Sequence, residues 1–264
     1  MKRICPVVIA LTGAAFSVLG QPPDPKELVV QSIANYDHDW RAGMQWGYTQ
    51  HDVTKGDGTS TLEVSEVIPI MGTPYEKLIS KNGQPLTPEE QRREDQKYEK
   101  TLKQRQNETP AEHTARIQKY ENERSFLKDL PNAYDFKMLG EDTDEGQPAW
   151  VIGLTPRADF VPTTNHGAML KHIQGRLWID KEAVQWAKAE AFVVDPITIG
   201  WIVARIGPGA RIFLDMTKVN DSLWMPSRIT INGSAKVLMV HNKNLNEELV
   251  FSGYHADNAY SSKK

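Results

Sequence analysis

Cysteine is almost absent from this chain of 264 residues, because its one cysteine, Cys5, lies close to the N-terminus. The surrounding segment begins with Lys2 and Arg3, continues as an uncharged, mostly apolar run and ends at the small residue Gly20. This pattern is typical of a secretory signal peptide, which we expect to span residues 1–20. The exported chain would then contain no cysteine. That excludes disulfides, a thiol nucleophile, cysteine metal sites and a lipid-modified cysteine.

The common catalytic motifs are also missing. The sequence has no G-x-S-x-G, H-E-x-x-H, Walker or Rossmann glycine pattern. Its seven histidines are scattered, and the acidic stretch 142–146 lacks the spacing of a calcium loop. We therefore predict a protein that is not an enzyme and that holds no metal and no cofactor. A secreted hydrolase stays open as an alternative, and it would need a carboxylate–histidine or carboxylate–carboxylate pair in a cleft.

No strong excess of one charge is present. Thirty-one basic and 34 acidic residues give a net charge of −3, which does not direct the protein toward nucleic acid or anionic lipid. The length and the hydrophobic content of 39% suit one globular domain. We expect a single domain over residues 21–264, monomeric, and periplasmic or secreted after the signal peptide is removed.

The C-terminal third of the chain has the pattern of an antiparallel sheet. Apolar and polar residues alternate within its segments, as at Ile212, Leu214 and Met216, and Gly, Asn and Asp punctuate them. Loops this short join antiparallel neighbours. The predicted strands are Leu177–Asp180, Val184–Asp195, Ile197–Ile206, Ala210–Asn220, Leu223–Asn232 and Ala235–Tyr254, with turns at 180–182, 207–209, 220–222 and 232–233.

Helices are predicted in two places. Asp24 is an N-cap before Pro25, and an apolar stripe at helical spacing follows until Gly43. Thr87 and Thr109 each begin a capping box. The segment 89–129 contains ten acidic and ten basic residues. We predict that residues 87–130 form a charged helical hairpin that projects from the sheet. It is either a solvated surface or an arm that docks a partner.

Aromatic and aliphatic residues exceed what one sheet face needs. Six tryptophans fall on predicted strands, and residues 197–204 are apolar on both faces. The excess is either ordinary packing under the first helix or the lining of an apolar cavity between helix and sheet. If a cavity exists, the residues predicted to line it and bind its ligand are Trp46, Leu62, Val64, Phe136, Ile152, Trp201 and Leu214.

Three short motifs carry a family resemblance: Leu177-Trp178-Ile179-Asp180, Leu223-Trp224-Met225-Pro226 and Phe251-Ser252-Gly253-Tyr254. With the export signal and the capped first helix, they resemble the outer-membrane lipoprotein-sorting (LolA/LolB-like) superfamily of periplasmic carriers. The stretch 75–86 is similar to an uncharacterised acidobacterial-type branch. The resemblance implies an α+β fold, in which a strongly curved antiparallel sheet, an incomplete β-barrel closed by helices, encloses an apolar cavity for acyl chains.

The resulting hypothesis is a periplasmic carrier or binding protein for the acyl chains of lipids or lipoproteins. Burial of each CH₂ group stabilises such a complex by about 0.8 kcal/mol, so one chain gives useful and reversible affinity. The main alternative is a cell-envelope interaction or sensor module without a transport role, in which residues 87–130 dock an envelope protein. We predict no nucleic-acid partner.

Overall fold

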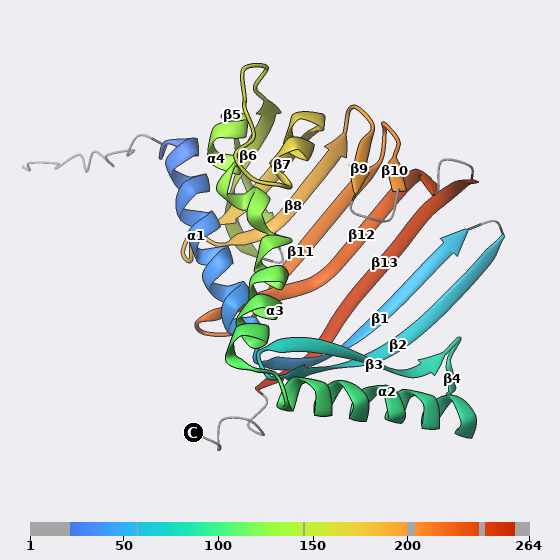
Figure 1. Cartoon of the computed structure of the whole chain (residues 1–264). Coiled ribbons are helices and arrows are strands. Elements are labelled where there is room, and N and C mark those ends of the chain that lie inside the picture. The colour runs from blue at the N-terminus through green and yellow to red at the C-terminus, as the bar shows by residue number, and fades with distance from the viewer. Residues whose placement is uncertain (1–21, 57, 145, 200–203, 238–240, 257–264) are drawn as a thin grey trace, which may run out of the picture.

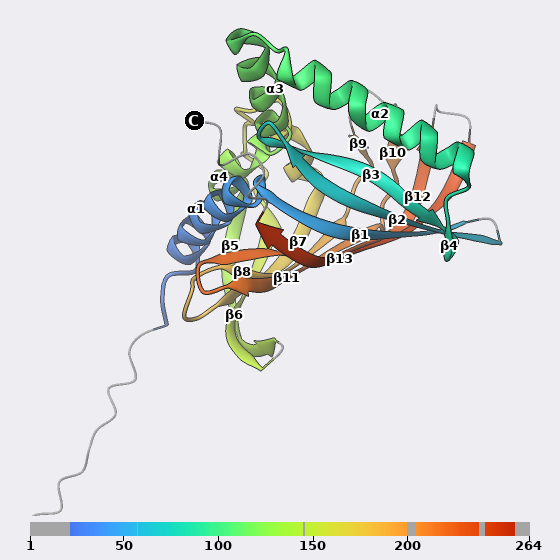
Figure 2. The same cartoon turned by 90° about the horizontal axis from the view of Figure 1, so that it is seen from below.

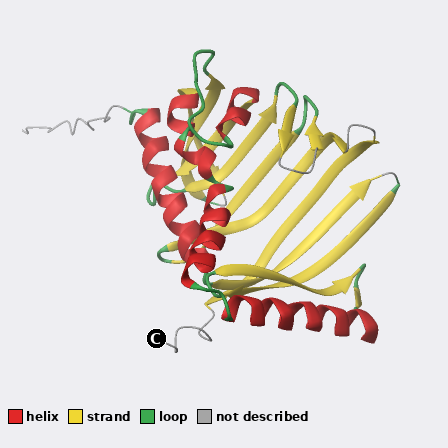
Figure 3. Cartoon of the chain, viewed as in Figure 1, coloured by secondary structure: helices red, strands yellow, loops and turns green. Residues whose placement is uncertain are grey.

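The computed structural model of the chain describes residues 22–56, 58–144, 146–199, 204–237 and 241–256. The predicted signal peptide and Trp201 lie outside these described residues. Most of the helices gather at one end of a single antiparallel sheet, and one long helix runs along an edge of it (Figure 3), so the predicted α+β class is confirmed. Within the described ranges, none of the helices combines the length and the apolar character needed to cross a bilayer.

The strands follow the alternating pattern of the sequence. They are β1 (Trp46–Gly56), β2 (Thr59–Ile70), β3 (Thr73–Lys81), β4 (Gln84–Pro85), β5 (Tyr134–Asp144), β6 (Gln147–Pro156), β7 (Ile173–Asp180), β8 (Trp186–Val193), β9 (Ile197–Ile199), β10 (Ala204–Ile206), β11 (Arg211–Asn220), β12 (Leu223–Val237) and β13 (His241–Ala256). Eleven of them lie in the order β4-β3-β2-β1-β13-β12-β11-β8-β7-β6-β5, and β10 with β9 attaches to β12 (Figure 1).

The sheet is open rather than the strongly curved, incomplete barrel predicted from the sequence. Its edges are β4 and β5, which do not pair with each other in the part of the chain that the structure describes. The N-terminal strand β1 pairs with the C-terminal strand β13, so the first and the last of the described strands lie side by side in the middle of the sheet. The amino-acid sequence around either strand does not indicate this pairing, because the two strands are distant in the chain.

One predicted turn is wrong. Asn232-Gly233 lies inside β12, where Asn232 pairs with Arg211 and Asn246 in the neighbouring strands. A β-carbon at Gly233 would lie 2.5 Å from the Cβ atom of Ala210, so this glycine permits a close approach between strands rather than a turn. The predicted strand Ile197–Ile206 is likewise divided into β9 and β10, which pair with each other.

The helices are α1 (Pro25–Gly43), α2 (Pro88–Gln106), α3 (Pro110–Asn122) and α4 (Leu130–Ala133), with the 3₁₀ helices η1 (Ser125–Lys128) and η2 (Gly167–His172). The predicted caps are confirmed. The Asp24 carboxylate accepts hydrogen bonds from two amides of the first turn of α1, and both capping boxes form at Thr87 and Thr109. Local chemistry therefore fixed where these helices begin.

The charged helices do not form a projecting hairpin. Helix α2 runs along β3, where Asp95 pairs with Lys77 at 2.7 Å and Tyr98 packs on Tyr75 (Figure 2). Helix α3 instead rises beside α1 (Figure 1). Two arginines anchor the junction between them, because Arg105 donates to three carbonyl groups around the β2–β3 turn and Arg116 donates to Met71 O and the Thr73 hydroxyl.

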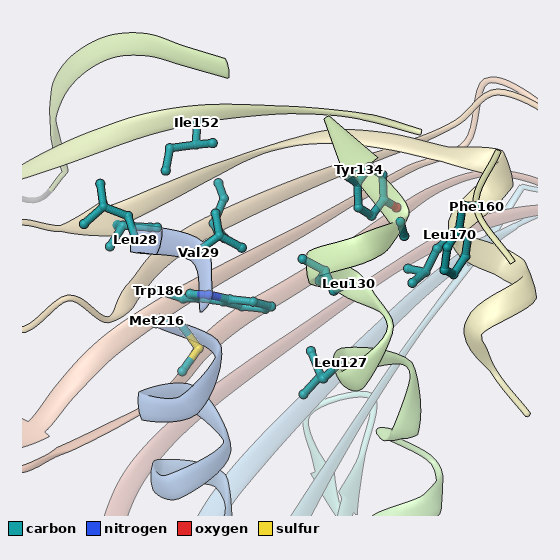
Figure 4. Packing of buried hydrophobic residues seen from close by; sticks show 13 residues of the cluster. Leu28, Val29, Leu127, Leu130, Tyr134, Ile152, Phe160, Leu170, Trp186 and Met216 are labelled. Atoms are coloured by element: carbon teal, nitrogen blue, oxygen red, sulfur yellow. The ribbon is translucent and has the colours of Figure 1, made fainter. Parts of the chain in front are cut away.

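The largest core lies between α1, the segment η1–α4 and the face of β5–β8 and β11. Side chains from all these elements converge in one cluster (Figure 4). Val29 and Ile152 are fully buried there, and Leu127 and Leu130 come from the end of the charged insertion. The end of the insertion is therefore part of the core, and burial of each such side chain contributes about 1.5–3 kcal/mol.

A buried carboxylate fixes the end of the insertion. Asp129 accepts hydrogen bonds from the backbone and the hydroxyl groups of Thr163 and Thr164, and only 2% of it is exposed. Burial opposes ionisation of Asp129, but the four donors outweigh it and lower its pKa below the ordinary value. Gly167 has no side chain because a β-carbon there would clash with this carboxylate.

Replacing Asp129 by Ala should lower the free energy of unfolding by about 1–3 kcal/mol, because buried donors lose their acceptor. The folded-state pKa of Asp129 lies below its unfolded value. Its stabilisation is therefore complete above the unfolded pKa and is lost as the pH falls through the folded pKa. Urea unfolding of both proteins across the acid range measures this. The exposed Asp135, changed to Ala, is the control, and equal losses for both variants would contradict the assignment.

Candidate functional site

A cavity of about 380 Å³ lies between α1, α3 and the inner face of the sheet, the face that carries the core. Its lining is mostly aromatic and aliphatic and comes from segments spread over the whole chain. The residues that line it are Tyr36, Trp40, Gly43, Met44, Tyr48, Pro74, Tyr120, Arg124, Ile212, Leu214, Met216, Trp224, Met225, Pro226, Ile229, Phe251 and Tyr254. Ligand pockets are typically concave, apolar spaces of roughly 300–1,000 Å³.

A polar stripe along α1 holds the helix over the cavity. Ser32 accepts a hydrogen bond from the Trp186 indole at 3.0 Å, and Asn35 donates to two carbonyl groups of the β7–β8 turn. Asp39, only 4% exposed, accepts from the Gln185 amide at 2.7 Å and from the Trp224 backbone at 3.0 Å. These polar residues, at spacings of three and four, fix the helix position beside its apolar stripe.

An aromatic series continues from the sheet to α3. The Trp186 ring stacks on Tyr36 at 4.3 Å, and the Trp40 ring stacks on Tyr120 at 5.4 Å. The Arg124 guanidinium joins the two pairs, since its carbon lies 4.5 Å from the Tyr36 ring centroid and 4.6 Å from that of Trp40. We call these five residues the aromatic stack. Rigid rings of this kind keep a space open that flexible side chains would fill.

Arg124 is the one charged residue among the described residues that line the cavity. Burial raises the pKa of three phenols there, Tyr48, Tyr120 and Tyr254, above the ordinary value, so these three stay neutral. Tyr254 also donates to the Pro226 carbonyl. The cavity is therefore apolar, neutral on most of its surface and positive at one place in its wall.

The inner face becomes polar beyond the cavity. Gln50 donates to Glu76 at 3.2 Å. Further along the same face, burial raises the pKa of Glu247, and the nearby Asp52 raises it further. The strand register places Glu247 between Thr54 and Ile231. Apolar surface suited to an acyl chain therefore ends before these carboxylates.

The structure places the predicted ligand residues in different surroundings. Leu214 lines the cavity, while Ile152 and Phe136 belong to or pack against the main core beside it. Trp46 is half-buried and does not line the cavity, and Trp201 lies outside the described residues. The structure thus brings Leu214, Ile152 and Phe136 to one face of the sheet.

Leu62 and Val64 face the other way. Register continues from Val64 through His51, Val250, Arg228, Asp215 and Lys188 to Trp178, on the face opposite the cavity. Leu62 shares that face because it is two residues away in the same strand. The prediction that both point into the cavity is wrong. A strand's apolar face cannot be assigned to one side of the sheet when the polar Glu63 and Glu66 lie beside it.

Several lining residues have no sequence signal of their own. Tyr120 and Arg124 come from the charged insertion, where they were expected to be solvated or to dock a partner. Met225 and Tyr254 lie within motifs that carried the family resemblance, but nothing in those motifs shows which side each faces. The apolar stripe of α1 was the usable signal, because Tyr36 and Trp40 belong to it.

A carboxylate–histidine pair of the kind that a hydrolase requires lies at a surface hollow in the described part of the chain. His38 Nδ1 lies 3.1 Å from Asp39 Oδ1, beside a surface hollow that also includes Ser222. The other Asp39 oxygen binds Gln185 and the Trp224 backbone, and the Ser222 hydroxyl donates to Asn220. The Asp39 carboxylate and the Ser222 hydroxyl are thus engaged in holding α1 and the β11–β12 turn. Among the described residues, no cluster of three metal-ligating side chains occurs.

Comparisons with known proteins find similarity only among solved structures. No family model matches the sequence, and no curated protein matches it. A LolA superfamily protein from Nitrosomonas europaea is 11% identical, covers 87% of this chain and 94% of its own, and has a TM-score of 0.35. A DUF1329 family protein from Desulfovibrio piger is also 11% identical, with coverages of 90% and 95% and a TM-score of 0.34. A structure of the Pseudomonas aeruginosa MucA/MucB complex is 11% identical, covers 84% of this chain and 93% of its own, and has a TM-score of 0.25.

Replacing Asp39 by Ala should destabilise the fold by about 1–3 kcal/mol, because the buried Gln185 and Trp224 donors lose their acceptor. The matched change is Asp37→Ala, which removes a partly exposed ion pair with Arg41 and should cost roughly 0–1 kcal/mol. Urea denaturation of the two variants gives the comparison. A smaller loss for the Asp39 variant than for the Asp37 variant would show that the polar stripe does not hold α1.

Proposed function

We propose that this protein binds the acyl chain of a lipid or lipoprotein in the cavity between α1, α3 and the sheet, as a periplasmic carrier or binding protein. The supporting observation is the cavity itself, about 380 Å³ in volume and lined by aromatic, methionine and aliphatic side chains. An apolar space that a folded protein keeps open favours an apolar guest, because water inside it would find few hydrogen-bond partners. The predicted signal peptide supports a location outside the cytoplasm.

The strength of such binding follows from the buried surface. Each methylene group moved from water into the cavity contributes about 0.8 kcal/mol, so burial of about ten methylenes supplies the roughly 8 kcal/mol of micromolar affinity. The complex stays reversible, as a carrier requires. No catalytic group is needed for this role, and the lining supplies none beyond neutral phenols and one arginine.

Delipidated protein should take up a fluorescent fatty acid, and Ile229→Trp should weaken that uptake roughly tenfold or more, because the added ring fills the cavity. Leu62→Trp, on the opposite face, should leave uptake unchanged. A fluorescence titration of the three proteins tests both points. Absence of uptake by the wild-type protein, together with no lipid found by mass spectrometry after gentle purification, would refute the proposed function.

A second role, the docking of an envelope protein on residues 87–130, has one supporting observation. Helix α2 has no buried residue, and it is attached to β3 by the Lys77–Asp95 and Tyr75–Tyr98 contacts described above. Its outer side is exposed, as at Arg93 and Lys100. Deleting the whole insertion cannot test this role, since Leu127 and Asp129 would be lost from the core.

Reversing exposed charges on α2, as in Arg93→Glu combined with Lys100→Glu, should keep the unfolding midpoint and abolish cross-linking to an envelope partner in cells. Both side chains are exposed, so the folded structure tolerates the change. The same reversal at Lys137, on β5, serves as the control. Unchanged cross-linking in the α2 variant would leave this helix as a solvated surface only.

A further inference from the structure

Arg124 carries a charge that the described part of the protein does not neutralise. Arg41 pairs with Asp37 and Glu121, and Arg116 pairs with Glu108, but no carboxylate lies within 4.0 Å of Arg124 among the described residues. Its Nε and Nη2 atoms are buried without an acceptor. Nη1 makes only a long contact of 3.4 Å with the Tyr36 hydroxyl.

A buried charge without a partner is unfavourable. Removing a guanidinium from water costs free energy that is normally recovered from a carboxylate or from several hydrogen bonds. The Tyr36 and Trp40 rings recover part of it, because their negative faces attract a cation. The two rings do not accept hydrogen bonds from the N–H groups in the guanidinium plane. The fork geometry of those N–H groups matches the two oxygens of a carboxylate or a phosphate.

The position of Arg124 suits an anion at the end of a chain. Arg124 and Trp40 line the cavity and also a second hollow of about 300 Å³ between α1 and the segment 121–131, next to Val30 and Leu127. Glu121, which also lines that hollow, is already paired with Arg41. A head group at Arg124 would therefore lie between the surface and the cavity.

We propose that the natural ligand is a single-chain anionic amphiphile, whose carboxylate or phosphate binds Arg124 while its chain lies along Leu214, Ile229 and Phe251. This inference rests on the proposed function and adds the class of ligand. The carboxylates Glu76 and Glu247 on the same face of the sheet repel an anion, so the head group has one favourable place. The cavity volume is near the lower end of the range for ligand pockets, which suits one chain.

The test compares head groups on one chain in the wild-type protein. Isothermal titration calorimetry with decanoate, decyl phosphate, decanol and decyltrimethylammonium measures four affinities for delipidated protein. At least one of the two anions should bind roughly tenfold or more tightly than decanol, and the cation should bind most weakly. The ratio of decanoate to decyl phosphate distinguishes a carboxylate from a phosphate ligand.

The variants assign the preference to one side chain. Arg124→Gln should bring decanoate and decanol to equal affinity, whereas Arg124→Lys should keep part of the preference, since the charge remains but the fork is lost. Arg93→Gln, an exposed arginine on α2, should leave all affinities unchanged. The unfolding midpoint of each variant is measured beside its affinities.

The outcomes separate the two proposals. Equal binding of anion and alcohol by the wild-type protein overturns the head-group inference and leaves the acyl-chain function standing. Binding of none of the four compounds overturns both. A preference for anions that persists in Arg124→Gln overturns the assignment to Arg124, and because the wild-type comparison needs no variant, misfolding of a variant cannot conceal the result.

Discussion

Ring contacts in the aromatic stack fix the distance of α1 and α3 from the sheet. Trp186 belongs to the sheet, Tyr36 and Trp40 to α1, Tyr120 to α3, and Arg124 to the turn after α3. These contacts thus fix the distances between three segments that are distant in sequence: β8, α1 and α3. Flat rings in contact tolerate little compression, so the helices cannot settle onto the strands beyond the stack. The cavity is the space that remains.

Apolar packing and hydrogen bonds together hold α1 in place. Its apolar stripe enters the core at Val29 and reaches the cavity at Trp40, while its polar stripe, ending in Asp39, binds strand ends. Apolar burial supplies most of the free energy but is not directional. Hydrogen bonds to a buried carboxylate are directional and costly to break. A helix held by both keeps one orientation over a space that is not filled by side chains.

The charged insertion illustrates how composition can mislead. Its equal numbers of acidic and basic residues predict a solvated arm, and α2 is indeed exposed along its outer side. Yet the same segment supplies Leu127 and Asp129 to the core and Arg124 to the cavity wall. A few apolar residues among many charges are enough to anchor such a segment when each one is buried.

Features that depend on neighbours along the chain could be predicted from the amino-acid sequence. The sequence predicts the helix caps at Asp24, Thr87 and Thr109, the apolar stripe of α1 and the alternation within strands. Caps and side-chain periods follow from local backbone geometry. The pairing of β1 with β13, the face on which Val64 lies and the close approach of Gly233 to Ala210 arise only in the folded chain. Each of these depends on contacts between distant segments. A strand's period says that its two faces differ, but which face meets the helix is settled only when the whole sheet has formed.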